Sequence, residues 1–154
     1  MIRVLMVCLG NICRSPMAEF VMKDMVEKNG LSEKIYIESA ATSSEEYGNP
    51  VYPPAVQELK KHGINSAGKY ARTLKKEDYD KFDYIIGMED RNIRNILRIV
   101  GSDPEKKVYL LMDFTDHPEN IDDPWYTGDF SGVFAQISEG CEALLDRLKQ
   151  ERRL

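Results

Sequence analysis

Short segments of the chain combine β-branched, aromatic and other apolar residues in the pattern of strands. They cover residues 2–7, 34–39, 83–88 and 107–111. The first is continuously apolar apart from Arg3, which is typical of a strand buried on both faces of a parallel sheet. We therefore predict four strands.

Helical periodicity fills the intervening segments. Ser15-Pro16 resembles an N-cap and a first helical residue, and Asn29-Gly30 resembles a helix end. Further one-faced patterns predict a short helix over 55–62, a helix over 93–100 and a last helix from about Val133. The polar segments 43–54 and 113–132 are predicted to be loops.

Strands that alternate with helices indicate an α/β fold with a parallel sheet. We detect no repeat, linker or low-complexity stretch, so residues 1–154 are predicted to form one domain. In such folds ligands bind beyond the carboxyl ends of the strands. Cys8 stands at that end of the first predicted strand.

The segment from Cys8 to Ser15 joins this strand to the next helix and can surround an anion. Its backbone N–H groups and the helix N-terminus can point at one spot. Gly10 and Asn11 tolerate the positive φ that a tight loop requires. Arg14 can bind two phosphate oxygens, and the same positive field favours Cys8 as a nucleophilic thiolate. Ser15 is placed to hydrogen-bond the sulfur.

The residues 7–19 as a whole resemble the signature of the low-molecular-weight protein tyrosine phosphatases. The likeness continues at 39–42, 82–85, 88–92 and 122–126, so it covers nearly the whole chain. It implies a four-stranded parallel sheet with helices on both faces and a phosphate loop after the first strand. It also implies that Cys8 is the nucleophile, that Arg14 clamps the phosphate, and that the substrate contacts Leu9, Gly10, Asn11, Ile12, Cys13 and Ser15.

The resemblance assigns a second group to the segment Asp123-Pro124-Trp125-Tyr126. Asp123 protonates the leaving group and then activates water to hydrolyse a cysteinyl phosphate. Its neighbour Asp122 is a weaker candidate. Trp125 and Tyr126 are expected to wall the pocket and stack on an aromatic substrate. Neither a metal nor a cofactor is expected, because Arg14 and the loop amides stabilise the charge.

The chain departs from the family pattern at several supporting positions. Glu45 stands where the family often has an aromatic pocket wall, and Tyr47, two residues later, could substitute for it. A histidine that helps to hold the loop asparagine is missing, so Asn11 must be held by Ser39 or another group. Glu89 replaces the usual aspartate in a supporting place close to Asn92.

Three other functions compete with a tyrosine phosphatase. Arsenate reductases on this fold need two further cysteines, and residues 71–100 contain none. A protein-arginine phosphatase tends to carry Thr at the place of Ile12, and an apolar Ile12 favours an aryl ring. A phosphate carrier that holds phosphocysteine without hydrolysing it has no use for Asp123.

The two remaining cysteines receive different predictions. Cys13 either forms a reversible disulfide with Cys8, as in the family, or packs within the loop. Cys141 lies on an apolar helix face and is predicted to be a core residue. An odd number of cysteines gives no disulfide framework.

Charge and hydropathy limit the partners. A formal net charge of −5 argues against general nucleic-acid binding, and no segment has the apolar length of a membrane span. The first residues are too short an apolar run for a signal peptide, so we expect a cytoplasmic protein. The expected partners are phosphotyrosine proteins and, from family habit, a tyrosine kinase, with phosphate or a similar oxyanion in the loop.

Overall fold

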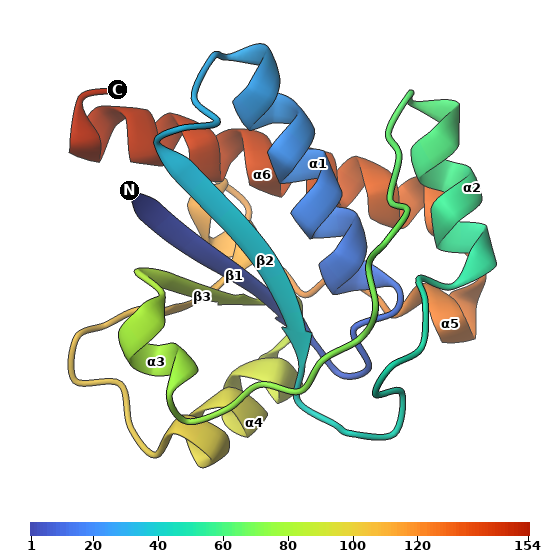
Figure 1. Ribbon diagram of the computed structural model, residues 1–154, viewed down its shortest axis with the longest axis horizontal. Coiled ribbons are helices and arrows are strands. Elements are labelled where there is room, and N and C mark those ends of the chain that lie inside the picture. The colour runs from blue at the N-terminus through green and yellow to red at the C-terminus, as the bar shows by residue number, and fades with distance from the viewer.

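Four parallel strands form the single sheet at the centre of the molecule (Figure 1). The computed structural model describes all 154 residues. The strands are β1 (Ile2–Cys8), β2 (Ile35–Ala41), β3 (Tyr84–Gly87) and β4 (Val108–Leu110), in the order β2-β1-β3-β4. The four predicted strands and their parallel arrangement are confirmed.

Helices cover both faces of this sheet (Figure 1). The helices α1 (Arg14–Lys28), α2 (Pro53–Lys61) and α6 (Phe130–Arg152) lie on one side, and α3 (Asp78–Lys81) and α4 (Asp90–Val100) lie on the other. Successive side chains of β1 point to opposite faces of the sheet. Val4 and Met6 therefore belong to the larger hydrophobic core, under α1 and α6, whereas Leu5 and Val7 belong to the smaller core on the other face.

Two local predictions from the sequence are wrong, and one short helix was not predicted. Ser15 is not an N-cap, because α1 already begins at Arg14 and the Ser15 hydroxyl faces the Cys8 sulfur instead. The predicted loop over 113–132 contains the helix α5 (Pro124–Thr127) and the first turn of α6, and a 3-10 turn, η1 (Leu111–Phe114), overlaps its start. The sequence of the short helix α3 has no recognisable periodic pattern, so this helix was not predicted.

The carboxyl ends of the strands bring three connecting segments together. The register pairs Cys8 with Ala41 and Val7 with Gly87, so β1, β2 and β3 end at the same edge. The segments that follow these strands therefore meet beside Cys8. No helix is long and apolar enough to cross a membrane.

Candidate active site

The Cys8 sulfur is surrounded by hydrogen-bond donors at the start of α1. The N–H groups of Asn11 and Ser15 donate to Sγ at 3.3 and 3.4 Å, and the Ser15 hydroxyl lies 3.0 Å from it. Donors and a helix N-terminus that point at sulfur favour the thiolate, which is the nucleophilic form. The loop geometry thus suits a nucleophile that must also act as a leaving group.

Asn11 fastens the loop to the neighbouring chain. It is the loop residue with positive φ, at 60°, whereas Gly10 keeps a negative φ. Its Nδ2 donates to the hydroxyls of Ser15 and Ser39 at 2.8 and 2.9 Å, and its Oδ1 accepts the Arg72 N–H at 3.1 Å. Three separate segments therefore hold the side chain that shapes the loop.

Gly10 serves the loop through its small size. A Cβ at this position would lie 3.3 Å from Cγ of Glu46, so the glycine allows the segment after β2 to approach closely. Of the two residues that tolerate positive φ in this loop, Asn11 supplies the left-handed conformation and Gly10 does not.

Arg14 lies buried beneath the loop, with its guanidinium held on one side. Its Nη1 donates to Glu89 Oε2 at 2.8 Å and to the Ile121 carbonyl at 2.9 Å. Burial by itself lowers the pKa of Arg14, but the charge of Cys8 and the Glu89 hydrogen bond outweigh it and raise the pKa overall. Arg14 therefore remains a cation beside the Cys8 sulfur.

Asp123 faces Arg14 from the loop before α5. Its Oδ2 lies 3.5 Å from Arg14 Nη2, and its Oδ1 accepts the Trp125 N–H at 3.0 Å as the cap of α5. The Ile121 N–H donates to the Met88 carbonyl at 2.9 Å, which ties this loop to the end of β3. The backbone that carries Asp123 is thus held in place, while the Asp123 side chain remains partly accessible.

These groups line one cavity of about 230 Å³. Trp125 and Tyr126 stand exposed at its edge, and Trp125 packs against Tyr52 with ring centroids 4.6 Å apart. The lining consists of Cys8, Leu9, Gly10, Ile12, Cys13, Arg14, Ser43, Glu45, Glu46, Asp123, Trp125 and Tyr126. A deep basic end and an aromatic mouth suit an aryl phosphate.

Four residues from the sequence-based set do not line this cavity. Asn11 and Ser15, which were expected to contact the substrate, are buried behind its wall. Tyr47 does not line this cavity; it lines a second one on the far side of its own loop. Asp122 is exposed and outside the cavity. Glu46, which the sequence interpretation missed, lines the cavity beside Glu45, so the wall that follows β2 is acidic rather than aromatic.

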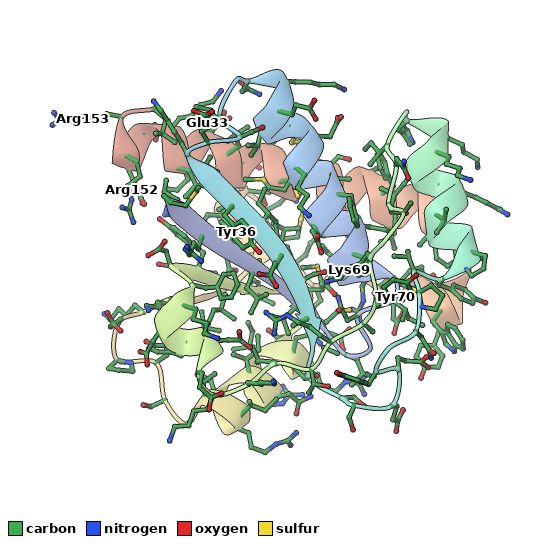
Figure 2. All side chains as sticks on the ribbon, viewed as in Figure 1. Glu33, Tyr36, Lys69, Tyr70, Arg152 and Arg153 are labelled. Atoms are coloured by element: carbon green, nitrogen blue, oxygen red, sulfur yellow. The ribbon has the colours of Figure 1, made fainter.

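A buried ion pair supports Ser39 from behind. Ser39 donates to Glu19 Oε1 at 2.5 Å, and Lys69 Nζ lies 3.3 Å from the same oxygen and donates to the Ser39 carbonyl at 2.8 Å. Lys69 occupies the space beside β2 (Figure 2). Burial lowers the pKa of Lys69, and Glu19 opposes that effect. Nothing local in the sequence signals this pair, because its members lie on distant segments of the chain.

Asn92 stabilises the backbone that carries Glu89. Its Oδ1 accepts the N–H groups of Met88 and Glu89, both at 3.0 Å, while its Nδ2 is buried without a partner. The side chain therefore fixes the turn between β3 and α4, from which Glu89 reaches Arg14.

The other cysteines are held as neutral thiols. Burial, followed by the charge of Cys8, raises the pKa of Cys13 to about 12, and burial raises the pKa of Cys141. Cys141 packs in the core of α6 and points at the Ala18 carbonyl, as predicted. No group of three His, Cys, Asp or Glu side chains is placed to hold a metal ion.

Comparison with known proteins matches this fold and site to one family. The model of the low molecular weight phosphotyrosine protein phosphatases matches residues 3–154. The low molecular weight protein-tyrosine-phosphatase YfkJ of Bacillus subtilis is 40% identical to this chain over 100% of both sequences. The crystal structure of YfkJ superposes with a TM-score of 0.95 and covers 98% of this chain and 96% of that chain. The Sus scrofa enzyme of the family is 40% identical over 95% of each chain.

One of the similar solved structures is named for a different phosphatase activity. The crystal structure of an arginine phosphatase from Drosophila is 31% identical, with a TM-score of 0.86 over 97% of this chain and 98% of that one. The chain belongs to the low molecular weight phosphotyrosine protein phosphatase family and is an enzyme of that class. The resemblance stated from the sequence is confirmed.

Proposed function

We propose that the protein hydrolyses phosphotyrosine in proteins, and small aryl phosphates, through a cysteinyl-phosphate intermediate. The observation that carries the proposal is the convergence of Cys8, Arg14 and Asp123 on one cavity. They supply a nucleophile, a cation for the phosphate oxygens and a proton donor for the leaving group.

In the first step the Cys8 thiolate attacks phosphorus. The S–P bond forms while the P–O bond to the tyrosyl oxygen breaks, and Asp123 gives its proton to that oxygen. Arg14 and the amides of the loop bind the remaining phosphate oxygens, whose charge they stabilise. The Asp123 carboxylate accepts a hydrogen bond from the Trp125 N–H. Its carboxyl group is therefore held over the cavity rather than free in solvent.

In the second step water replaces the cysteine. Asp123, now a carboxylate, accepts a proton from water as the water oxygen attacks phosphorus. The S–P bond breaks and its electron pair returns to sulfur, where the Ser15 hydroxyl and two N–H groups stabilise the thiolate. Inorganic phosphate leaves, and the site is ready for another cycle with Cys8 as a thiolate and Asp123 protonated.

The cavity walls support phosphotyrosine as the substrate class. Ile12 lies on the cavity wall, and Trp125 and Tyr126 stand at its mouth, where an aryl ring leaves the loop. Apolar and aromatic walls contact a ring favourably but leave the N–H groups of a phosphorylated guanidinium unpaired. A protein-arginine phosphatase stays the second candidate, because the Drosophila relative is described by that activity.

Arsenate reduction and phosphate carriage fit the site less well. An arsenate reductase needs further cysteines near Cys8 and Cys13, but Cys141 is fully buried in α6. A phosphate carrier does not need an acid beside the phosphate, and Asp123 lies there. A cytoplasmic location and a partner tyrosine kinase remain predictions that accompany the proposal.

The proposal is tested with an aryl phosphate and three proteins. We expect the wild type to hydrolyse it, Cys8→Ser to lose nearly all activity, and Cys141→Ala to keep it as a cysteine control outside the cavity. Phosphoarginine added as a competing substrate reports on the second candidate. Activity retained by Cys8→Ser would contradict the mechanism, and faster turnover of phosphoarginine than of phosphotyrosine would contradict the substrate class.

A further inference from the structure

A second cavity, of about 330 Å³, lies between the edge of β2, the segment before α3 and α3 itself. We call it the basic cavity, defined by Arg3, Tyr47, Arg72, Lys75 and Lys81, which line it. It shares no lining residue with the catalytic cavity. The mechanism proposed above uses none of these side chains.

The carboxylates in the basic cavity are already paired. Arg72 donates to Glu38 at 3.2 Å and to both oxygens of Asp78 at 3.1 and 3.3 Å. Four cationic and two acidic side chains line the cavity, so its local charge is +2 although the chain carries −5. The surface is therefore positive where the protein as a whole is negative.

The remaining cations have no acidic partner. Arg3, Lys75 and Lys81 form no ion pair within 4 Å, and Lys75 and Lys81 are exposed. The Arg3 guanidinium lies over the ring of Tyr36, labelled on β2 in Figure 2, at 5.5 Å from its centroid. Asp83 accepts the backbone N–H of Arg3 but does not line the cavity. Three cationic groups are thus available to an external anion.

One loop separates the two cavities. Ser43, Glu45 and Glu46 line the catalytic cavity, and the next residue, Tyr47, lines the basic cavity with its side chain exposed. An extended peptide advances by about 3.3 Å per residue. A substrate chain whose phosphotyrosine enters the catalytic cavity can therefore extend across this loop toward the basic cavity.

We propose that the basic cavity binds acidic side chains of the substrate protein a few residues away from the phosphotyrosine. This inference rests on the proposed function. Glu45 and Glu46 repel carboxylates close to the phosphate, whereas Arg3, Lys75 and Lys81 attract them beyond the loop. The preferred substrate accordingly has neutral or basic residues directly beside the phosphotyrosine and acidic residues farther along one side.

The inference is tested with a series of phosphotyrosine peptides of equal length. Pairs of glutamates are placed next to the phosphotyrosine, or three to six residues away on either side, against a neutral reference peptide. We expect distant glutamates on one side to raise kcat/KM by about threefold to tenfold at low salt, because each exposed ion pair contributes only modestly to binding. The gain should shrink at high salt.

Charge reversal locates the effect. Lys75→Glu/Lys81→Glu should abolish or invert the preference for distant glutamates, and Lys76→Glu, an exposed neighbour outside the cavity, should keep it. All three proteins should hydrolyse a small aryl phosphate at the wild-type rate, because that substrate cannot reach the basic cavity. The non-phosphorylated acidic peptide, added separately, should leave aryl phosphate hydrolysis unchanged.

The outcomes separate this inference from the proposed function. Absence of aryl phosphate hydrolysis by the wild type would overturn the proposed function itself. Normal hydrolysis without an acidic preference, or a preference that survives Lys75→Glu/Lys81→Glu, would overturn the inference alone. A change of aryl phosphate turnover by the separate acidic peptide would indicate a regulatory anion site and would equally overturn substrate recognition as its role.

Discussion

Arg14 is the one arginine or lysine among the fully buried residues, and Glu89 is the carboxylate that holds it in place. The two side chains meet at 2.8 Å, with Arg14 1% and Glu89 20% exposed. Glu89 contacts the side of the guanidinium that also meets the Ile121 carbonyl, which leaves Nη2 directed toward Asp123. Glu89 thus sets the orientation of the Arg14 guanidinium without itself lining the cavity.

Removing the Glu89 carboxylate should therefore affect both stability and turnover. Glu89→Ala leaves a buried guanidinium with less compensation, and breaking a buried ion pair from one side costs about 3 kcal/mol. We expect a lower free energy of unfolding in urea and a lower kcat for an aryl phosphate. Arg91→Ala is the matched control, since Arg91 contacts the other oxygen of Glu89 at 3.4 Å from an exposed position. Equal losses in both variants would contradict this role.

Asp123→Asn should change the pH dependence of catalysis as well as its rate. The amide can neither donate a proton to the leaving oxygen nor accept one from water, so we expect kcat to fall by about 10²–10⁴. The proposed mechanism needs a thiolate at Cys8 and a proton on Asp123, which predicts a bell-shaped profile for the wild type. In Asp123→Asn the alkaline limb should flatten. A wild-type profile that is flat from about pH 4 to 9 would contradict these roles.

Buried thiols make the stability of the fold sensitive to alkali. The pKa of Cys13 is about 12 in the folded protein against an ordinary value of 9.0, and burial also raises the pKa of Cys141. The unfolded chain loses these protons first, so the stabilisation is complete below about pH 9 and is lost as the pH rises toward the folded pKa.

Urea unfolding between pH 8 and 11 checks this prediction. The free energy of unfolding should fall above pH 9, by at most about 1.4 kcal/mol per pH unit for each thiol. Cys141→Ala should be less stable than the wild type at pH 7 but should lose less stability on the way to pH 11. Parallel curves for the two proteins would show that Cys141 does not contribute.

The elements that could be predicted from the sequence are those fixed by local patterns. The run before Cys8 and the loop after it carry enough signal to place the first strand, the anion-binding turn and the start of the helix within two residues. Ser15 was misassigned because a hydroxyl at a helix start also suits an N-cap. Its expected contact with the Cys8 sulfur is confirmed, at 3.0 Å.

The side chains at the rim of the cavity could be predicted only in part, because their positions depend on long-range contacts. The wall after β2 was expected to carry Glu45, with Tyr47 as an aromatic alternative. Glu45 lines the cavity, but Tyr47 does not, and Glu46 packs near Gly10 and lines it as well. The support of Asn11 was expected from Ser39, yet the structure adds Lys69 and Glu19 behind it. Neither placement follows from periodicity, since both depend on segments brought together by the sheet.

The Glu19–Lys69 pair should therefore position Asn11 indirectly, through Ser39. Lys69→Met leaves the 4%-exposed Glu19 carboxylate with one cation, Lys23, which lies at 2.5 Å from its other oxygen and is itself half-exposed, besides the Ser39 hydroxyl. We expect a loss of about 3 kcal/mol in unfolding free energy, and a lower kcat with little change in KM, because the loop geometry shifts while the cavity stays open. Glu19→Gln/Lys69→Met should recover most of the stability, since no buried charge is then left unpaired. Lys60→Met, which removes an exposed lysine on α2, controls for the loss of a positive charge. A double variant no more stable than Lys69→Met would show that the Glu19 and Lys69 side chains act independently.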